Sequence, residues 1–554
     1  MFDRRQFLGA GAALTIAGRS IAAEAPLDCA LVGGSIWTGR PGGRTDAVGI
    51  VGDRIAAVGA RAVRARTGRS TRIIGLGGAF AMPAFIDNHT HFLMGASALG
   101  RPDLLEVKTR ADFVARIDAA ARAHPDRWLL GGPWDEQRFG GALPTREWID
   151  PVTPNTPVAI PRTDLHSYLC NSVALKLAGI TRNTPDPKGG VIVRDAAGEP
   201  TGVLKDNAKE LVERVIPPLS PSQAEEALRA GIAHGLARGI AQVHIPDPFG
   251  WTNFDALRRL RAKGETDMRF YNFVPLQDWE RMAALVKSEG RGDDWVRWGG
   301  LKALVDGSLG ARTALFREPY SDDPATRGVR VMPLTELRDA VIGADRARLQ
   351  VTVHAIGDEA NDDILDVYAE AVRVNGARDR RFRVEHAQHI RPATIPRFAR
   401  QKVIASVQPY HAIDDGRWAV KRIGERRLDG TYAFASLINS GATTTFGSDW
   451  PVAPIDPLIG IYAAVTRETI DGANPRGWLP DQKVTVEQAL MAYTVTNAFA
   501  GFQDDRLGRI APGFLADLVV LDRDPTTTDP EALPKTQVLR TFVGGKERYT
   551  GAAA

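Results

Sequence analysis

The sequence predicts an α/β fold in which one (β/α)₈ barrel carries the chemistry. Short apolar runs alternate with helical stretches such as residues 221–238 and 335–347, as repeated βα units require. Six candidate metal-binding side chains each lie at the end of an apolar run: His89, His91, Lys302, His354, His386 and Asp449. Because barrels build their active sites at the carboxyl ends of different strands, this order places all six at one site.

Eight apolar runs are the expected barrel strands. They lie at residues 81–86, 241–245, 269–274, 301–305, 350–353, 382–385, 403–407 and 443–446. The gap between the first two is far longer than an ordinary βα loop. It therefore predicts an insertion at about residues 95–215, with a fold of its own, that covers the substrate.

Both ends of the chain carry strands bounded by glycine turns. They fall at residues 29–38, 47–59, 508–521 and 539–546. We expect one small β domain, a β-sandwich, whose halves are residues 26–80 and 501–554, around a barrel region of residues 81–500. These strands are expected to give structural support only.

The first residues resemble an export signal. Residues 3–9 read Asp-Arg-Arg-Gln-Phe-Leu-Gly, a twin-arginine motif, and an apolar stretch then leads to small residues at 22–25. We interpret residues 1–25 as a removed signal read by the twin-arginine export machinery, which predicts a periplasmic protein. A disordered basic N-terminus is the alternative, and the apolar stretch is too short for a membrane anchor.

Composition narrows the range of partners. The 554 residues are 44% hydrophobic and 25% charged, as in ordinary globular proteins, with a net charge of +4. No block of like charge or basic patch with interleaved aromatics occurs, so nothing supports binding to nucleic acid or to a membrane surface. We expect a small-molecule substrate, two free thiols at Cys29 and Cys170, and leave a homo-oligomer open.

The candidate ligands have alternatives when each is taken alone. His89 and His91 are two residues apart, so on a strand both imidazoles would face one cation, although two surface histidines would give the same pattern. His354 ends an apolar run, where a buried structural histidine is common. Asp449 precedes Trp-Pro and could cap a helix or a turn. The order of all six favours the metal site.

Six segments carry a resemblance to a known family: residues 82–91, 306–314, 354–358, 385–388, 408–411 and 447–451. They read MPAFIDNHTH, DGSLGARTA, HAIGD, EHAQ, QPYH and GSDWP. They resemble the YtcJ-like branch of the amidohydrolase superfamily, the metal-dependent hydrolases of amidohydrolase family 3. The resemblance covers nearly the whole chain after the leader and implies that both ends pack beside one barrel. It is specific for the family and much weaker for the substrate.

The resemblance implies a metal-binding role for Lys302. An ammonium group has no lone pair, but a neutral lysine amine can add carbon dioxide, and the resulting carbamate can bridge two metals. One ion would then bind His89, His91 and Asp449, and the other would bind His354 and His386. The alternative is an interior Lys302 paired with Asp306 or with another carboxylate, and a site for one metal. Imidazole with carboxylate favours zinc, with manganese, iron or cobalt as alternatives.

The expected chemistry is hydrolysis of carbon–nitrogen bonds other than peptide bonds, in linear or N-substituted amides. A metal lowers the pKa of bound water from 15.7 to ~7, and the hydroxide attacks the carbonyl. The expected catalytic residues are Asp449, which passes the proton to the departing amine, and His386. Alternatives are hydrolysis of lactones, esters or cyclic amides, a one-metal deaminase in which His386 activates the substrate, and a non-catalytic binding barrel. Lys302 argues against the deaminase, and the full set of ligands argues against the binding barrel.

Five further residues are candidates for binding the substrate. His411 ends the seventh predicted strand and could bind the oxyanion, whereas Arg312 could orient the substrate or form a structural ion pair. His244 could line the pocket or pack beside it. In the insertion, His166 belongs to a segment similar to the family's Gly-His-x-x-x-x-Asn pattern, although Leu165 replaces its small residue. Trp134 could form an apolar wall or pack in a core.

Overall fold

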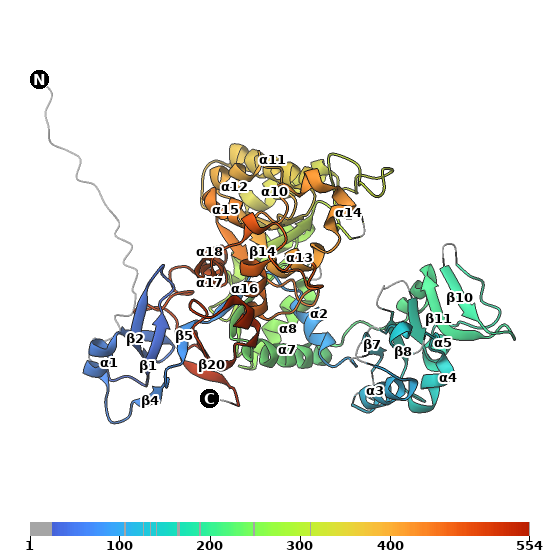
Figure 1. The fold of residues 1–554 in the computed structure, drawn as a ribbon, viewed down its shortest axis with the longest axis horizontal. Helices are drawn as coiled ribbons and strands as arrows, with labels where there is room; N and C mark the ends of the chain where they lie inside the picture. Colours follow the sequence, from blue (N-terminus) through green and yellow to red (C-terminus); the bar gives the residue numbers. More distant parts are fainter. Residues whose placement is uncertain are drawn as a thin grey trace, which may run out of the picture.

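A computed structural model of the chain has three parts: a barrel, a mixed sheet and an insertion (Figure 1). It describes residues 25–552 except 103, 105–106, 124, 126, 133, 140, 163–166, 188–189, 248–249 and 311. Residues 1–24 of the predicted signal lie outside the described residues. Within the described residues, every helix is too short or too polar to cross a membrane.

The barrel sheet consists of eight parallel strands in chain order. They are β6 (Phe85–Asp87), β12 (Ile240–Ile245), β13 (Arg269–Pro275), β14 (Val296–Leu304), β15 (Gln350–Ala355), β16 (Arg383–His386), β17 (Ile404–Val407) and β18 (Thr444–Phe446). Beyond the ends of β18 and β6, the Asp449 amide donates to the His89 carbonyl at 2.7 Å and the His91 amide donates to the Trp450 carbonyl at 2.8 Å. These contacts bring the two edge strands together, so the sheet is a nearly closed barrel.

The first predicted barrel strand is wrong in part. Residues 81–86 are divided between β5 (Phe80–Pro83), which belongs to the mixed sheet, and β6 of the barrel. Pro83 has no amide hydrogen for a ladder, and the Ala84 amide donates to the Asp517 carbonyl in the mixed sheet. The apolar run is continuous because both strands are fully buried, and the sequence alone does not show the break.

Helices follow the barrel strands and cover the sheet (Figure 1). The principal ones are α7 (Pro221–Leu236), α8 (Gly250–Ala262), α9 (Trp279–Glu289), α10 (Leu334–Arg346), α11 (Asp358–Asn375), α12 (Ile395–Gln401), α15 (Phe434–Asn439), α16 (Pro457–Thr466), α17 (Val486–Ala492) and α18 (Val495–Ala500). Helix α7 begins where Ser220 and Gln223 form a capping box and Pro221 occupies the first turn. Its buried Leu228, Ile232 and Leu236 belong to the barrel core.

Strands from both ends of the chain form the mixed sheet, in the order β21-β20-β19-β5-β1-β2-β3 with β4 beside β1. They are β1 (Cys29–Trp37), β2 (Arg44–Val51), β3 (Arg54–Val58), β4 (Arg72–Gly75), β5, β19 (Leu518–Leu521), β20 (Val538–Val543) and β21 (Lys546–Thr550). The antiparallel β5–β19 pair joins the two halves. The predicted strand at 508–521 is corrected, since residues 508–517 form turns and irregular backbone. One continuous sheet is present, and its sandwich form stays a prediction.

The insertion has its own five-stranded sheet, in the order β10-β11-β9-β8-β7. Its strands are β7 (Leu129–Leu130), β8 (Val158–Pro161), β9 (Ser167–Cys170), β10 (Gly190–Arg194) and β11 (Pro200–Asp206), accompanied by α3 (Arg110–Ala123), α5 (Ser172–Leu177) and α6 (Glu210–Glu213). In Figure 1 it lies beyond the side of the barrel that carries α2 (Phe92–Ala98), α13 (Pro409–Asp415) and α14 (Ala419–Ile423). Its predicted role in covering the substrate stays a prediction. Cys170 here and Cys29 in β1 are buried free thiols, as expected.

Candidate metal centre

Strand ends and the loops after them deliver the six predicted ligands. Lys302 lies near the end of β14, His354 lies in β15, and His386 is the last residue of β16. Asp449 follows β18 in a loop. The barrel therefore brings together residues that are far apart in the sequence.

The expected strand geometry of the His-x-His pair is wrong, although the two rings do converge. Strand β6 ends at Asp87, and His91 is the N-cap residue of α2. His89 Nε2 lies 3.4 Å from Asp449 Oδ1, and His91 Nε2 lies 3.2 Å from the same oxygen. A parallel bridge between Thr90 and Trp450 connects this segment to the loop that carries Asp449.

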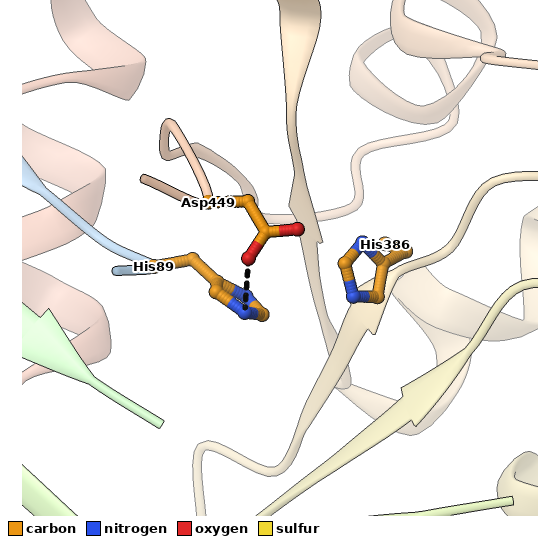
Figure 2. A group of neighbouring side chains, drawn as sticks. All are labelled: His89, His386 and Asp449. Atoms are coloured by element: carbon orange, nitrogen blue, oxygen red, sulfur yellow. Dashed lines mark ion pairs between the residues drawn. The ribbon is translucent and has the colours of Figure 1, made fainter. Parts of the chain in front are cut away.

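Three side chains form the tightest group. His89, His386 and Asp449 each offer one ligand atom, and these atoms lie within 4.8 Å of one another. Figure 2 shows the Asp449 carboxylate turned toward the His89 ring, with the His386 ring across from it. All three residues are buried. Asp449 has a φ of 63° and His386 a φ of 72°, so both hold left-handed backbone conformations that are uncommon outside glycine.

His354 extends this group on the side of His386. The ring centroids of His354 and His386 are 4.4 Å apart, and those of His89 and His386 are 5.0 Å apart. His354 Nε2 lies 3.0 Å from the Gly307 carbonyl and 3.5 Å from Asp306 Oδ1. These contacts occupy one ring nitrogen and leave Nδ1 of His354 as the nitrogen available for coordination.

Unpaired buried atoms show that the site fits a divalent cation. Within the described residues, His89 Nε2, His386 Nδ1, Asp449 Oδ1 and His411 Nε2 are buried and make no hydrogen bond. Leaving one such polar atom unpaired costs about 1–3 kcal/mol. Imidazole nitrogens and a carboxylate oxygen are the donors that divalent transition metals prefer. Coordination would satisfy atoms for which the protein provides no hydrogen-bond partner.

Glu385 is the main functional residue of the site that was not predicted from the sequence. Its Oε2 lies 2.5 Å from His89 Nδ1 and accepts a hydrogen bond from Ser406 Oγ at 2.6 Å. Its Oε1 contacts Arg383 and the Thr352 hydroxyl. A carboxylate on one imidazole nitrogen fixes the ring so that the other nitrogen faces the metal. The sequence indicates this role only through two charged residues, Arg383 and Glu385, which alternate with Val384 in a strand that is fully buried.

Two further carboxylates support the ligands. Asp247 Oδ2 lies 3.7 Å from His91 Nδ1. The Asp306 carboxylate accepts the backbone amides of Leu315, Ile356 and Gly357 at 2.8–3.0 Å, which fixes the loops around His354. Asp306 is therefore a loop anchor. The described contacts show no ion pair between it and Lys302.

Burial and neighbouring charge determine the protonation of the imidazoles. Burial, assisted by the Lys302 charge, lowers the pKa of His89 to about 4 and that of His354 to about 3. Burial also disfavours a charged His91, but the nearby carboxylates of Asp247 and Asp449 outweigh it and raise the pKa of His91 to about 9. Two of these ligands are thus neutral at pH 7, whereas His91 must release a proton to bind a metal.

The two charged candidates respond in opposite ways. Burial alone would raise the pKa of the Asp449 carboxyl, but His89 and His91 hold it well below its usual range. Burial lowers the pKa of Lys302, which is 3% exposed, against the opposing charges of Glu385 and Asp449. Asp449 is therefore ionised in the metal-free site, while the environment of Lys302 favours its neutral amine more than water does.

His411 is near the centre, and His244 lies beside it. The His411 ring stacks on His386 with centroids 6.1 Å apart, and its Nε2 lies 3.7 Å from Asp449 Oδ2. The fully buried His244 Nδ1 lies 3.1 Å from Asn88 Oδ1 and 3.2 Å from Arg383 Nη1. His411 is thus placed to reach a substrate at the centre, whereas these contacts make His244 part of the barrel interior.

The remaining candidates lie elsewhere. Arg312 forms a two-pronged ion pair with Asp322, at 3.1 and 3.0 Å, the structural alternative expected for it. Trp134 is fully buried in the insertion core and donates from Nε1 to the Ile160 carbonyl at 3.1 Å. His166 lies outside the described residues.

Comparison with known proteins identifies the family. Residues 72–549 match the Amidohydrolase family. This chain belongs to the amidohydrolase family. It is 39% identical over 520 residues to the protein LONG AFTER FAR-RED 3 of Arabidopsis thaliana, covering 91% of this chain and 88% of that protein. It is 34% identical over 526 residues to the putative amidohydrolase YtcJ of Bacillus subtilis, covering 93% and 98%.

Two further similarities concern activity and metal dependence. The chain is 29% identical over 532 residues to the N-substituted formamide deformylase of Arthrobacter pascens, covering 91% of this chain and 94% of that enzyme. A crystal structure of an uncharacterized metal-dependent hydrolase from Pyrococcus furiosus superimposes with a TM-score of 0.77 at 31% identity, covering 90% and 100%. The amidohydrolase is thus an enzyme of the metal-dependent amidohydrolase superfamily, a hydrolase acting on carbon–nitrogen bonds.

Proposed function

We propose that this amidohydrolase hydrolyses linear or N-substituted amides of small molecules, including N-substituted formamides, at a metal centre built by His89, His386 and Asp449. The observation that carries the proposal is the convergence of buried donor atoms from these three residues without hydrogen-bond partners. The deformylase relative supports the choice of amide. A divalent cation bound there would polarise a carbonyl oxygen and lower the pKa of a bound water.

The protein's own residues then divide the remaining work. Asp449 is buried beside the ligands and ionised, so it can accept a proton from the attacking water and deliver it to the leaving nitrogen. His411 Nε2, 3.7 Å from Asp449 Oδ2, is placed to donate to the negative charge that develops on the carbonyl oxygen. Glu385 holds the His89 ring in place throughout.

Zinc, a second metal and a carboxylated Lys302 complete the proposal. Its support is the burial of Lys302, the lowered pKa of its amine and the absence of an ion pair to it within the described contacts. His91 with Asp449, and His354 with His386, lie on the two sides of the central group and could serve two ions. With a free amine at Lys302, the same centre would hold one ion.

Location and architecture are also proposed. We retain twin-arginine export to the periplasm on the strength of residues 3–9, a complete (β/α)₈ barrel, and an insertion that closes over the substrate. In Figure 1 the insertion stands apart from the barrel on the side that carries α2 and α14, so the proposed closure requires it to approach the barrel from that side. A small-molecule substrate fits a centre whose ligands His89, His386 and Asp449 are buried.

A substrate panel tests the proposed reaction. Purified metal-replete enzyme would be assayed with N-substituted formamides, longer linear amides, lactones and aminopurines, with release of amine and acid measured directly. Turnover of formamides or linear amides above the others is expected. Turnover confined to lactones would overturn the choice of amide, and release of ammonia from aminopurines alone would establish a deaminase.

A further inference from the structure

A cavity lies at the opposite end of the barrel from the metal centre. Its volume is about 200 Å³, and it is lined by side chains near the starts of three strands, Tyr271 in β13, Arg297 in β14 and Gln350 in β15. On β14 and β15 the candidate ligands Lys302 and His354 come later along the strand. Because the strands are parallel, the cavity faces the amino-terminal end of the sheet and the metal centre faces the other end.

The lining of this cavity carries an excess of positive charge. Five arginines contribute, together with one carboxylate, that of Asp379: Arg291, Arg297, Arg348, Arg378 and Arg380. Asp379 forms an ion pair with Arg381, outside this lining. Asp345 neutralises Arg378 and Arg380 together, contacting Arg380 Nε at 2.8 Å. The neighbouring carboxylates are therefore already engaged.

Three of the arginines have no carboxylate partner in the part of the chain that the structure describes. Arg297 Nη1 donates to the Phe502 carbonyl at 3.2 Å, and Arg291 Nη2 donates to the Arg348 carbonyl at 2.6 Å. No hydrogen bond from the Arg348 side chain is present among the described contacts. A guanidinium has five N–H donors, so most of the donors of these three groups have no protein partner among the described residues.

Water can hydrate the exposed Arg348, but Arg291 and Arg297 are partly buried, so the positive charges that they place beside this cavity are unfavourable without a counter-charge. Burial lowers the pKa of Arg297, and the charges of Arg506 and Arg291 act in the same direction. Arginine nevertheless keeps its proton in proteins, so the repulsion cannot be relieved by deprotonation. A bound anion relieves it and also supplies acceptors for the unpaired N–H groups.

We propose that this cavity is a binding site for a compact oxyanion, a phosphate or a small carboxylate, held by Arg291, Arg297 and Arg348. The volume of about 200 Å³ is below the ~300–1,000 Å³ of pockets for drug-sized ligands, which restricts the ligand to a small anion or a single anionic group. The ligand would link β14 to the α10–β15 connection and to the segment after α18, because Arg297, Arg348 and Phe502 belong to these. It would therefore stabilise the fold rather than take part in amide hydrolysis.

Thermal unfolding of the full-length protein tests the site. The midpoint would be measured against inorganic phosphate and against malonate, with chloride at matched ionic strength as the reference. A saturable rise in Tm is expected for at least one oxyanion. The anion with the lower half-saturating concentration shows whether the site prefers phosphate or a carboxylate. Arg297→Gln is expected to raise the half-saturating concentration by about tenfold or more, through loss of charge-assisted hydrogen bonds.

Controls separate a specific site from a general salt effect. Arg338→Gln removes an exposed arginine of α10 that pairs with its neighbour Asp339, and it should keep the wild-type response. Arg348→Gln gives a second variant if Arg297→Gln does not fold, and it should also weaken the response. A response that does not saturate, or that is equal in wild type and in the Arg297 and Arg348 variants, would mean an adventitious ion only and would overturn the proposal.

Discussion

At the residue scale, the ligands and their order along the chain were predictable from the sequence, but the side chain that orients His89 was not. His89, His91, His354, His386 and Asp449 are recognisable because each follows an apolar run. Glu385 differs, because its role depends on meeting His89 from a strand almost three hundred residues away in the chain. Spacing within the sequence carries no trace of such a contact, and only a buried charge in a strand marks it.

Substitution of Asp449 tests whether its carboxylate transfers the proton during hydrolysis. Asp449→Asn keeps the size of the side chain and removes the base, so kcat for the best amide substrate should fall by about 10²–10⁴-fold. Steady-state kinetics at matched metal content measures the change. The exposed Glu425→Gln serves as the control and should retain wild-type turnover. Near-normal turnover by Asp449→Asn would limit Asp449 to capping the turn.

Substitution of Glu385 tests whether its carboxylate orients the His89 ring for metal binding. Glu385→Gln removes the charge beside His89 Nδ1, and loss of such a partner typically weakens metal affinity by about 10–100-fold. Competition with a chelator of known affinity gives the metal Kd of wild type and variant. Equal affinities would show that the packing around the ring is sufficient to orient it.

At the element scale, strand positions were predictable to within a few residues, but not where one strand ends and another begins. The run at residues 81–86 is apolar throughout because β5 and β6 are both buried, although they belong to different sheets. The extension of β14 back to Val296 was missed because Arg297 interrupts the apolar pattern. Arg297 lines the cavity at the amino-terminal end of the barrel sheet, and this position explains why a charged residue lies within a barrel strand.

The loop after β16 gives a prediction about pH. Burial, assisted by the Arg427 charge, lowers the pKa of His389 to about 3, whereas an unfolded histidine titrates near 6.5. The neutral ring therefore contributes stability above about pH 6.5, and this contribution is lost as the pH falls toward 3. His389→Gln removes one group that binds a proton on unfolding. The fall in the free energy of unfolding with decreasing pH should therefore become less steep, by up to ~1.4 kcal/mol per pH unit. Denaturant unfolding of both proteins from pH 7 to pH 4 measures this, and parallel curves would contradict it.

At the scale of the whole molecule, the joining of both chain ends beside the barrel was expected, but the ion pair that fixes them was not. Arg269 of β13 and Asp517 before β19 form a buried two-pronged ion pair at 2.7 and 2.9 Å. Asp517 Oδ1 also accepts the Gly544 amide at 2.7 Å. Neither residue stands out in the sequence, since each is a single charge at a strand boundary.

Breaking this ion pair should loosen the mixed sheet from the barrel. Asp517→Ala leaves Arg269 buried and unpaired, so the free energy of unfolding should fall by about 3–5 kcal/mol. Asp339→Ala removes one member of an exposed pair and should cost less than about 1 kcal/mol. Denaturant titration monitored by tryptophan fluorescence measures both. Similar small losses would show that the other contacts between the mixed sheet and the barrel are sufficient to hold them together.

The most direct test of the central claim is anomalous X-ray diffraction from crystals of metal-replete protein. We expect an anomalous peak bounded by His89 Nε2, His386 and Asp449, whose buried ligand atoms converge without hydrogen-bond partners among the described residues. A second peak nearby would support two ions and a carboxylated Lys302. No peak among these side chains, or a metal bound only elsewhere, would contradict a metal centre at this site.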